Sequence, residues 1–224
     1  MDSRRRHWSQ QQQLFREALF SKTRHDEAMR LLLSQHAMLH SAQMAGSGEW
    51  SFEDEVLAGL SDEQLRTRPL ATGNSIAWLI WHVARIEDVT MNLLVAGRPQ
   101  VFHEMNWPER LEIQRRDVGT SMSDSEVADF TRQVSLAALR AYRMAVGRGT
   151  RAIIAALQPA EVWERVDPER VRQLVAEDAL AQGALDLARF WGGRRKAGIL
   201  TMPATRHSYT HLSEARAVRG KLLR

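Results

Sequence analysis

Two pairs of histidines in this sequence have the spacing of neighbours on one helical face. His36 and His40 form the first pair, and His207 and His211 form the second. At about 100° of rotation per residue, side chains four positions apart lie about 40° apart, so both imidazoles of a pair can point at one centre. The same spacing occurs in helical zinc sites, although two histidines alone are too few ligands for a metal.

The second pair has an acidic residue close to its face but lacks a zinc-protease motif. Glu214 follows His211 by three positions. Position 208 is serine, whereas the HExxH motif of zinc proteases requires a glutamate there as general base. The pair is therefore a candidate for metal binding, but not for that class of protease.

The third candidate ligand is His82, which lies in the strongly apolar stretch IAWLIWHVARI. An imidazole buried there without a partner would lose its hydrogen bonds to water. One interpretation is a core histidine bonded to a backbone carbonyl or to a carboxylate such as Glu87. The other is a metal ligand, because a third histidine from a facing helix leaves a cation with open positions for water or substrate. Spacing alone does not decide which of the two pairs His82 would join.

Length and composition indicate a single globular domain. The chain has 224 residues, enough to bury one sizeable core. Apolar residues make up 44% and charged residues 26%, values that argue against wholesale disorder. The sequence pI is about 10.1, but the net charge is only +4. Dense basic clusters occur only at residues 4–6 and 194–196, so we expect no nucleic-acid partner.

The chain contains no cysteine. This excludes disulfides, thiolate ligands and a cysteine nucleophile, and any thiol chemistry would need a small-molecule thiol. The apolar run at residues 76–81 is far shorter than the roughly 20 residues of a membrane-spanning helix. Polar residues follow the basic N-terminus where a signal peptide would be apolar. We therefore expect a cytoplasmic protein with no membrane partner.

Apolar residues recur at spacings of three and four, which predicts an all-α protein. Capping-box spacings begin at Ser61 and Ser123, and Asp167 precedes a first-turn proline. The predicted helices cover residues 26–44, 52–60, 75–97 and 123–157, and a further helix begins at 168. A last helix extends to about 222. It begins at Pro203, or it begins near 184 and is kinked at Pro203. Residues 98–122 are expected to pack across the bundle. The predicted organisation is an N-terminal extension at 1–25 and one four-helix bundle domain at 26–224.

Four residues near His82 receive ordinary structural interpretations. Trp78 and Trp81 stand at helical spacing and are predicted to be core residues rather than a platform for substrate. Arg85 and Glu87 are predicted to form an ion pair on the bundle surface, worth no more than about 0.5 kcal/mol. If Arg85 instead faced a pocket, it could hold an anionic substrate.

Three stretches resemble the DinB/YfiT-like superfamily. They are NSIAWLIWHVARIED, the GRPQVF that comes after it, and TRHSYTHLSEARAVRGKL. That superfamily has a histidine on the second bundle helix, usually after a tryptophan, and an HxxxH pair on the fourth. Trp81 and His82 match the first feature, and His207 and His211 match the second. The similarity covers residues 26–223 in element order and is specific in the two histidine-bearing stretches.

The resemblance implies a DinB-type four-helix bundle with additional short helices, in which His82, His207 and His211 hold a divalent metal ion, zinc or nickel. It also implies an enzyme with a small-molecule substrate. The reaction would be transfer or isomerisation with a low-molecular-weight thiol such as mycothiol or bacillithiol, or metal-assisted hydrolysis. A homodimer is expected as well. His36 and His40 stay unassigned, either as partners of the ligands or as packed residues.

A second hypothesis places the function on a surface. The chain would then be a stress-related binding or interaction protein, with a structural metal or none, that acts through a dimer surface. A closed coordination sphere, or no metal after purification, would favour it. Two features also depart from the superfamily pattern: the segment at about 166–190 is long, and the N-terminal extension is additional.

Overall fold

The computed structural model describes residues 3–46, 48, 50–70 and 72–224, so residues 1–2 of the predicted extension lie outside the described residues. All regular structure within these ranges is helical, apart from one isolated bridge between Arg165 and Arg195, which confirms the all-α prediction. The α-helices are α1 (Ser3–Leu19), α2 (His25–Met38), α3 (Ala42–Ala45), α4 (Phe52–Leu57), α5 (Asp62–Arg66), α6 (Ile76–Asp88), α7 (Trp107–Leu111), α8 (Asp124–Gln133), α9 (Leu136–Ala156), α10 (Pro168–Ala176), α11 (Asp186–Gly192), α12 (Lys196–Thr201) and α13 (Ser208–Leu222). Two segments are π-helical, η1 (Val89–Ala96) and η5 (Met202–His207), and three are short 3₁₀ turns, η2 (Val101–His103), η3 (Glu161–Trp163) and η4 (Gln182–Ala184).

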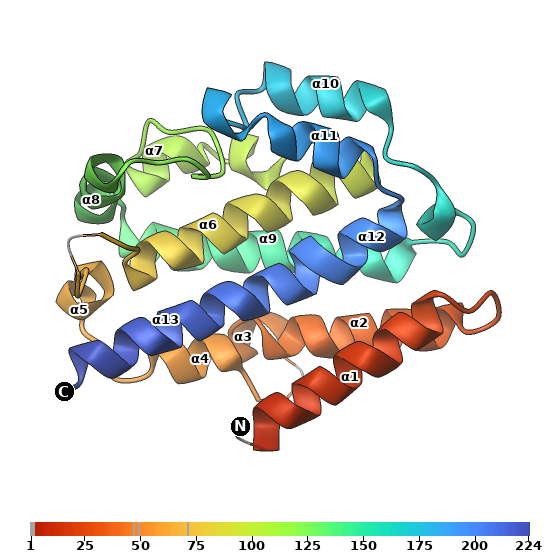
Figure 1. Cartoon of the computed structure of the whole chain (residues 1–224), viewed down its shortest axis with the longest axis horizontal. Coiled ribbons are helices and arrows are strands. Elements are labelled where there is room, and N and C mark those ends of the chain that lie inside the picture. The colour runs from red at the N-terminus through yellow and green to blue at the C-terminus, as the bar shows by residue number, and fades with distance from the viewer. Residues whose placement is uncertain (1–2, 47, 49, 71) are drawn as a thin grey trace.

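Four long helical segments form the bundle. Figure 1 shows α2, α6, α9 and the continuous helix of α12, η5 and α13 running side by side, with α1 along α2. α10 and α11 lie over the end of the bundle where η1 is, and α7 and α8 lie near the N-terminal end of α6. Within the described ranges, no helix has both the length and the apolar character that a membrane span requires.

The central helix of the bundle is α6, and all of its residues are buried. The helix is therefore enclosed by the rest of the bundle, and its polar side chains must find partners inside the protein. Ser75 caps it by accepting a hydrogen bond from the backbone N–H of Trp78. Its continuation η1 ends at Gly97, whose φ of 64° favours glycine and where a Cβ would lie 2.4 Å from Nη2 of Arg170. The helix that carries His82 thus begins and ends at positions that its sequence specifies.

The predicted single helix at 123–157 is in fact two helices, α8 and α9. The chain turns at Val134, and Ser135 caps α9 by accepting a hydrogen bond from the backbone of Ala138. Carbonyls at the end of α8 accept from Arg66, which donates to Thr131 at 2.7 Å and to Val134 at 2.8 Å. The prediction was wrong because a side chain 65 positions earlier satisfies the carbonyls that end the helix.

The predicted helix at 26–44 also ends early, at Met38. Nη2 of Arg143 donates to the carbonyl of Leu39 at 3.1 Å, and Oγ of Ser51 donates to the carbonyl of His40 at 2.7 Å. These two side chains replace the backbone donors that a longer helix would have provided. His40 therefore lies beyond the regular part of α2.

The last helix passes through Pro203, starting at Lys196 rather than at Pro203 or near 184. Proline has no backbone N–H to donate to the preceding turn, and the chain widens there into the π-helical segment η5. Single π-helical turns of this kind are frequent at functional sites. His207 is the last residue of η5, and His211 lies in the first turn of α13.

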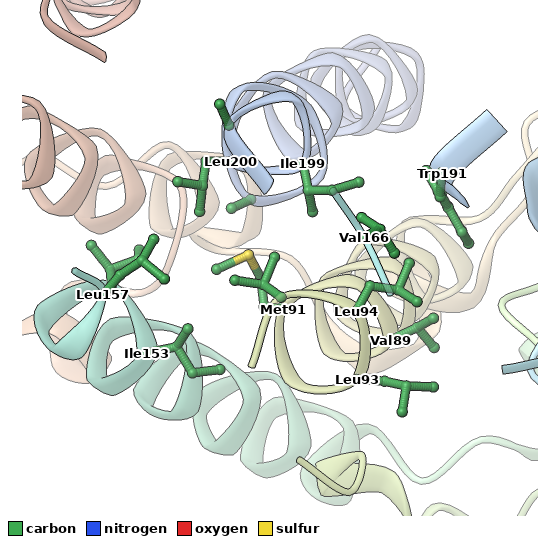
Figure 2. Packing of buried hydrophobic residues seen from close by; sticks show 14 of the residues in the cluster. Val89, Met91, Leu93, Leu94, Ile153, Leu157, Val166, Trp191, Ile199 and Leu200 are labelled. Carbon is green, nitrogen blue, oxygen red and sulfur yellow. The ribbon is translucent and has the colours of Figure 1, made fainter. Parts of the chain in front are cut away.

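The core consists of two apolar clusters. Figure 2 shows part of one cluster, in which Met91 of η1, Ile153 of α9 and Leu200 of α12 pack together. The other cluster surrounds the first part of α6 and includes α4, α7 and α8. Along α6 the change falls between Ala84 in one cluster and Ile86 in the other.

Polar side chains from all four bundle segments lie at or near the change between the two apolar clusters, and we call this set the polar layer. Its members are His36 from α2 and His40 just after it, His82, Arg85, Glu87 and Asp88 from α6, Arg143 and Thr150 from α9, and His207, Ser208 and His211 from the last helix. Burial of polar groups is costly unless they have partners. The polar layer is therefore the part of the core whose side chains need partners, and it contains the candidate functional residues.

Two glycines of α9 test how tightly the layer is packed. A Cβ at Gly147 would lie 2.7 Å from Nδ1 of His40 and 3.1 Å from Cε of Met44, whereas a Cβ at Gly149 has its nearest neighbour at 3.6 Å. We expect Gly147→Ala to lower the free energy of unfolding by about 1–3 kcal/mol through overpacking. Gly149→Ala, the matched control, should raise it by about 0.5–1 kcal/mol because glycine is a poor helix former. Urea denaturation measures both, and equal effects would contradict the packing described.

Candidate metal centre

Three histidines of the polar layer converge on one point. Ring centroids lie 5.1 Å apart for His82 and His207, 4.9 Å for His82 and His211, and 4.5 Å for His207 and His211. One nitrogen from each ring lies within 4.8 Å of one nitrogen from each of the others. In the described part of the chain, no hydrogen bond joins any two of these rings. The sequence placed these side chains on two helices more than a hundred positions apart, and the fold brings them together.

Two of the rings are held by hydrogen bonds through Nδ1. His82 donates from Nδ1 to the carbonyl of Val118 at 2.6 Å, because a carbonyl can only accept. His211 donates from Nδ1 to Oε2 of Glu214 at 3.0 Å, and Oε1 of Glu214 accepts from Asn74 at 3.0 Å. In each ring the proton on Nδ1 leaves Nε2 with a free lone pair. This is the outer arrangement that orients histidine ligands in metal sites.

A tight loop places the carbonyl that orients His82. Gly119, with φ of 84°, passes over the two tryptophans, and a Cβ there would lie 2.5 Å from Cζ3 of Trp81. Only glycine fits this approach, and it brings the preceding residue, Val118, onto His82. The ring of Trp78 stacks on His82 at 4.8 Å with planes 9° apart. Trp81 is fully buried, as predicted for a core residue, whereas Trp78 also forms a wall of the site.

The environment keeps His82 and His207 neutral. Burial, and then the neighbouring His211, lower the pKa of His82 to about 4. Burial and then His82 and His211 hold the pKa of His207 well below its ordinary value. The hydrogen bond from His211 lowers the pKa of Glu214, so that carboxylate stays ionised and continues to accept. Neutral imidazoles are the form that binds metal ions.

His207 provides the test of whether these residues fit a cation. Its Nδ1 is buried and has no hydrogen-bond partner among the residues that the structure describes. A buried nitrogen without a partner costs about 1–3 kcal/mol. A divalent cation bound at that nitrogen would offset the cost, and three imidazoles, two of them oriented by hydrogen bonds, suit it chemically. The donor set therefore fits a metal ion.

The other histidine pair forms a second buried cluster, which does not include His82. Nε2 of His36 lies 2.7 Å from Oε1 of Glu87, and Nε2 of His40 lies 2.9 Å from Oε2. Arg143 donates from Nη1 to Oε2 of Glu87 at 2.7 Å and from Nε to Glu53 at 3.0 Å. All five side chains are at most 7% exposed. The polar layer thus contains two separate histidine groups.

The second cluster has metal-ligand residues but the geometry of a hydrogen-bonded ion network. Its nitrogen–oxygen distances of 2.7 and 2.9 Å are hydrogen-bond distances. The guanidinium of Arg143 already neutralises the carboxylate that a cation would need. Although burial alone would raise the pKa of Glu87, His40, His36 and Arg143 hold it well below its ordinary value. Burial lowers the pKa of His40 to about 3, so Glu87 is an anion beside a neutral imidazole. Of the two candidate groups, the three histidines therefore have the geometry better suited to a cation.

The predicted surface pair of Arg85 and Glu87 is wrong, because both side chains are fully buried and do not pair with each other. Glu87 belongs to the second cluster. Arg85 donates to Gln100 at 2.9 Å, to Tyr142 at 3.1 Å and to the carbonyl of Arg116 at 2.7 Å, so it is a structural cation rather than part of a substrate pocket. The error arose because α6 is buried on all sides and has no solvent-facing side.

Sequence reasoning missed most partners of the candidate ligands and of the second cluster. Val118 contributes a backbone atom 36 positions from His82, and Asn74, Glu53 and Arg143 lie 56 to 140 positions from the side chains they contact. Only Glu214 had a usable signal, since it stands three positions after His211 on the same helix.

Comparisons with known proteins bear on the fold and the family. The sequence profile of the DinB superfamily matches residues 49–189, a stretch that includes His82 and ends before His207. The structure is similar to a crystal structure of a conserved protein from Enterococcus faecalis, with a TM-score of 0.54 and 16% identity over 94% of this chain and 96% of that one. At that identity the likeness concerns the fold alone. A search of curated proteins found no match.

Proposed function

This chain belongs to the DinB superfamily, and on that premise we propose that it is a metal-dependent enzyme in which His82, His207 and His211 hold one divalent cation. The observation that carries the proposal is the convergence of three imidazoles, with ligand atoms within 4.8 Å of one another. The buried Nδ1 of His207 adds to it, because that atom has no other partner in the described residues.

Zinc or nickel suits this donor set better than magnesium or calcium. All three side chains offer nitrogen, whereas magnesium and calcium prefer oxygen ligands. Three protein ligands leave at least one position free, which is the pattern of catalytic rather than structural zinc sites. When bound, such a cation supplies Lewis acidity and lowers the pKa of a water or thiol that takes the free position.

The residues of the chain would divide the remaining work. His82 and His211 keep their protons on Nδ1, held by Val118 and Glu214, and present Nε2 to the centre. Trp78, stacked on His82, excludes water from one side and offers an apolar surface to a substrate. The half-buried side chain of His211, 22% exposed, leaves the centre within reach of solvent on the side of α13.

The proposed substrate class is a low-molecular-weight thiol together with an electrophile. The chain has no cysteine, so a sulfur nucleophile must arrive with the substrate. In the transfer reaction a sulfur–carbon bond forms to the electrophile, the thiol loses its proton, and the leaving group departs with the bonding electrons. The family supports this reaction class, and the site supports it by providing neutral nitrogen ligands and an apolar wall.

Thiol consumption in the presence of a chromogenic aryl halide tests the reaction. Zinc- or nickel-loaded wild type should turn over at least one small thiol, and His82→Ala should be slower by about 100-fold or more because the ligand set is broken. His103→Ala is the matched control, since His103 lies in neither histidine cluster, and it should keep wild-type activity. Absence of turnover with every thiol tried would overturn the transferase proposal.

A further inference from the structure

The proposed chemistry leaves the buried ion pair of Glu87 and Arg143 unused. Glu87 has 0% of its side chain exposed and Arg143 has 1%, and their oxygen and nitrogen atoms lie 2.7 Å apart. His36 and His40 donate to the same carboxylate, and their rings stack with centroids 4.1 Å apart. Replacing a buried ion pair with apolar residues of similar size is often neutral or stabilising. Stability alone is therefore a weak reason for this pair to be here.

The pair lies beside the three-histidine centre in the polar layer. α6 carries both His82 and Glu87, five positions apart, which is about 7.5 Å along a helix axis. α2, which carries His36, packs against η5, which ends at His207, and α9, which carries Arg143, packs against α6. Arg143 stays next to Glu87 through their 2.7 Å contact. Opposite charges at such a separation act on a cation at the centre in opposite senses.

We propose that Glu87 and Arg143 are positioning residues with opposite electrostatic effects on the three-histidine centre. Glu87 strengthens the hold on a divalent cation, and Arg143 weakens it. The inference rests on the proposed function, because it needs a cation at that centre. His36 and His40 keep Glu87 ionised and fixed in place by donating to its two oxygens. Charges inside a protein interior are screened far less than at its surface, so the effect persists at physiological salt.

The sign of the effect separates this role from a purely structural one. If the pair only held α2, α6 and α9 together, removing either partner would loosen the centre and weaken metal binding in both cases. If the pair acts through charge, Glu87→Gln weakens binding and Arg143→Met strengthens it. A unit charge at that separation inside a protein changes the affinity for a cation by about 10–100-fold. That range is large enough to measure in either direction.

Zinc affinity, measured by competition with a chromophoric chelator, is the test. From the Coulomb interaction we expect Glu87→Gln to bind zinc about 10–100-fold more weakly than wild type and Arg143→Met about 10-fold more tightly. The double variant should return to within about threefold of wild type because the two charges cancel. The matched control is Arg140→Met, on the same helix as Arg143 but 51% exposed in its pair with Asp62, and it should bind zinc as wild type does.

Folding of each variant is checked by circular dichroism before titration. If Glu87→Gln does not fold, the zinc affinities of Arg143→Lys and Arg143→Met are compared instead. Lysine retains the positive charge, so Arg143→Lys should retain wild-type affinity. Weaker binding in both Glu87→Gln and Arg143→Met, or unchanged binding in both, overturns the inference and leaves the three-histidine site standing. A wild type that binds no zinc overturns the proposed function and this inference together.

Discussion

Purified wild-type protein should carry close to one divalent metal ion per chain, and the His82→Ala and His211→Ala variants should carry almost none. Each substitution removes one of three nitrogen ligands, and loss of a direct ligand should exceed the roughly 10–100-fold loss typical of outer partners. The expected value is one ion rather than two because Arg143 already pairs with Glu87 in the second cluster. Elemental analysis after dialysis measures the content directly.

His103→Ala is again the control for metal content, since it removes a histidine outside both clusters. Metal retained at wild-type levels by His82→Ala and His211→Ala would mean that the ligands have been assigned wrongly. A wild type without metal would instead favour the alternative hypothesis of an interaction protein that acts through a dimer surface. Two ions per chain, with one lost in His40→Ala, would show that the second cluster also binds a cation.

Local signals in the sequence predicted helix starts well. The capping boxes at Ser61 and Ser123 and the Asp167 cap are present as predicted, because all the atoms involved lie within four positions of one another. Helix ends were predicted less well. α8 and α2 end where Arg66 and Arg143 donate to their last carbonyls, and these arginines are distant in the sequence. A pattern read along one helix contains no information about such a donor.

The same limit applied to the candidate site. The two histidine pairs have identical spacing, so the choice between them came from the resemblance of the His82 and His207–His211 stretches to the superfamily and not from periodicity. What physically separates the pairs is Glu87 with Arg143, which surround His36 and His40 with hydrogen bonds. The sequence reading had assigned Glu87 to the surface. The thiol, the homodimer and the cytoplasmic location stay predictions.

Acid should destabilise the metal-free protein at pH values where its carboxylates are still ionised. His40, with a pKa lowered to about 3, and His82, with a pKa lowered to about 4, are neutral in the folded state and titrate near 6.5 when unfolded. A folded-state pKa below the unfolded one means that the unfolded chain binds the proton first. Stability is therefore full above pH 6.5 and is lost as pH falls from 6.5 toward 4 and then 3.

At about pH 5 each of these two histidines should lower the free energy of unfolding by about 2 kcal/mol relative to its value at about pH 7.5. Together they should lower it by roughly 4 kcal/mol. Urea denaturation of chelator-treated protein at the two pH values measures the difference. His82→Ala should remove its own share of about 2 kcal/mol, because His40 and His207, whose pKa values are also lowered, still titrate in this way, whereas His103→Ala should leave the full difference. Equal stability at the two pH values would contradict the burial of neutral imidazoles in the polar layer. Added zinc should raise stability mainly at the higher pH, because protons compete with the metal for the same nitrogen atoms.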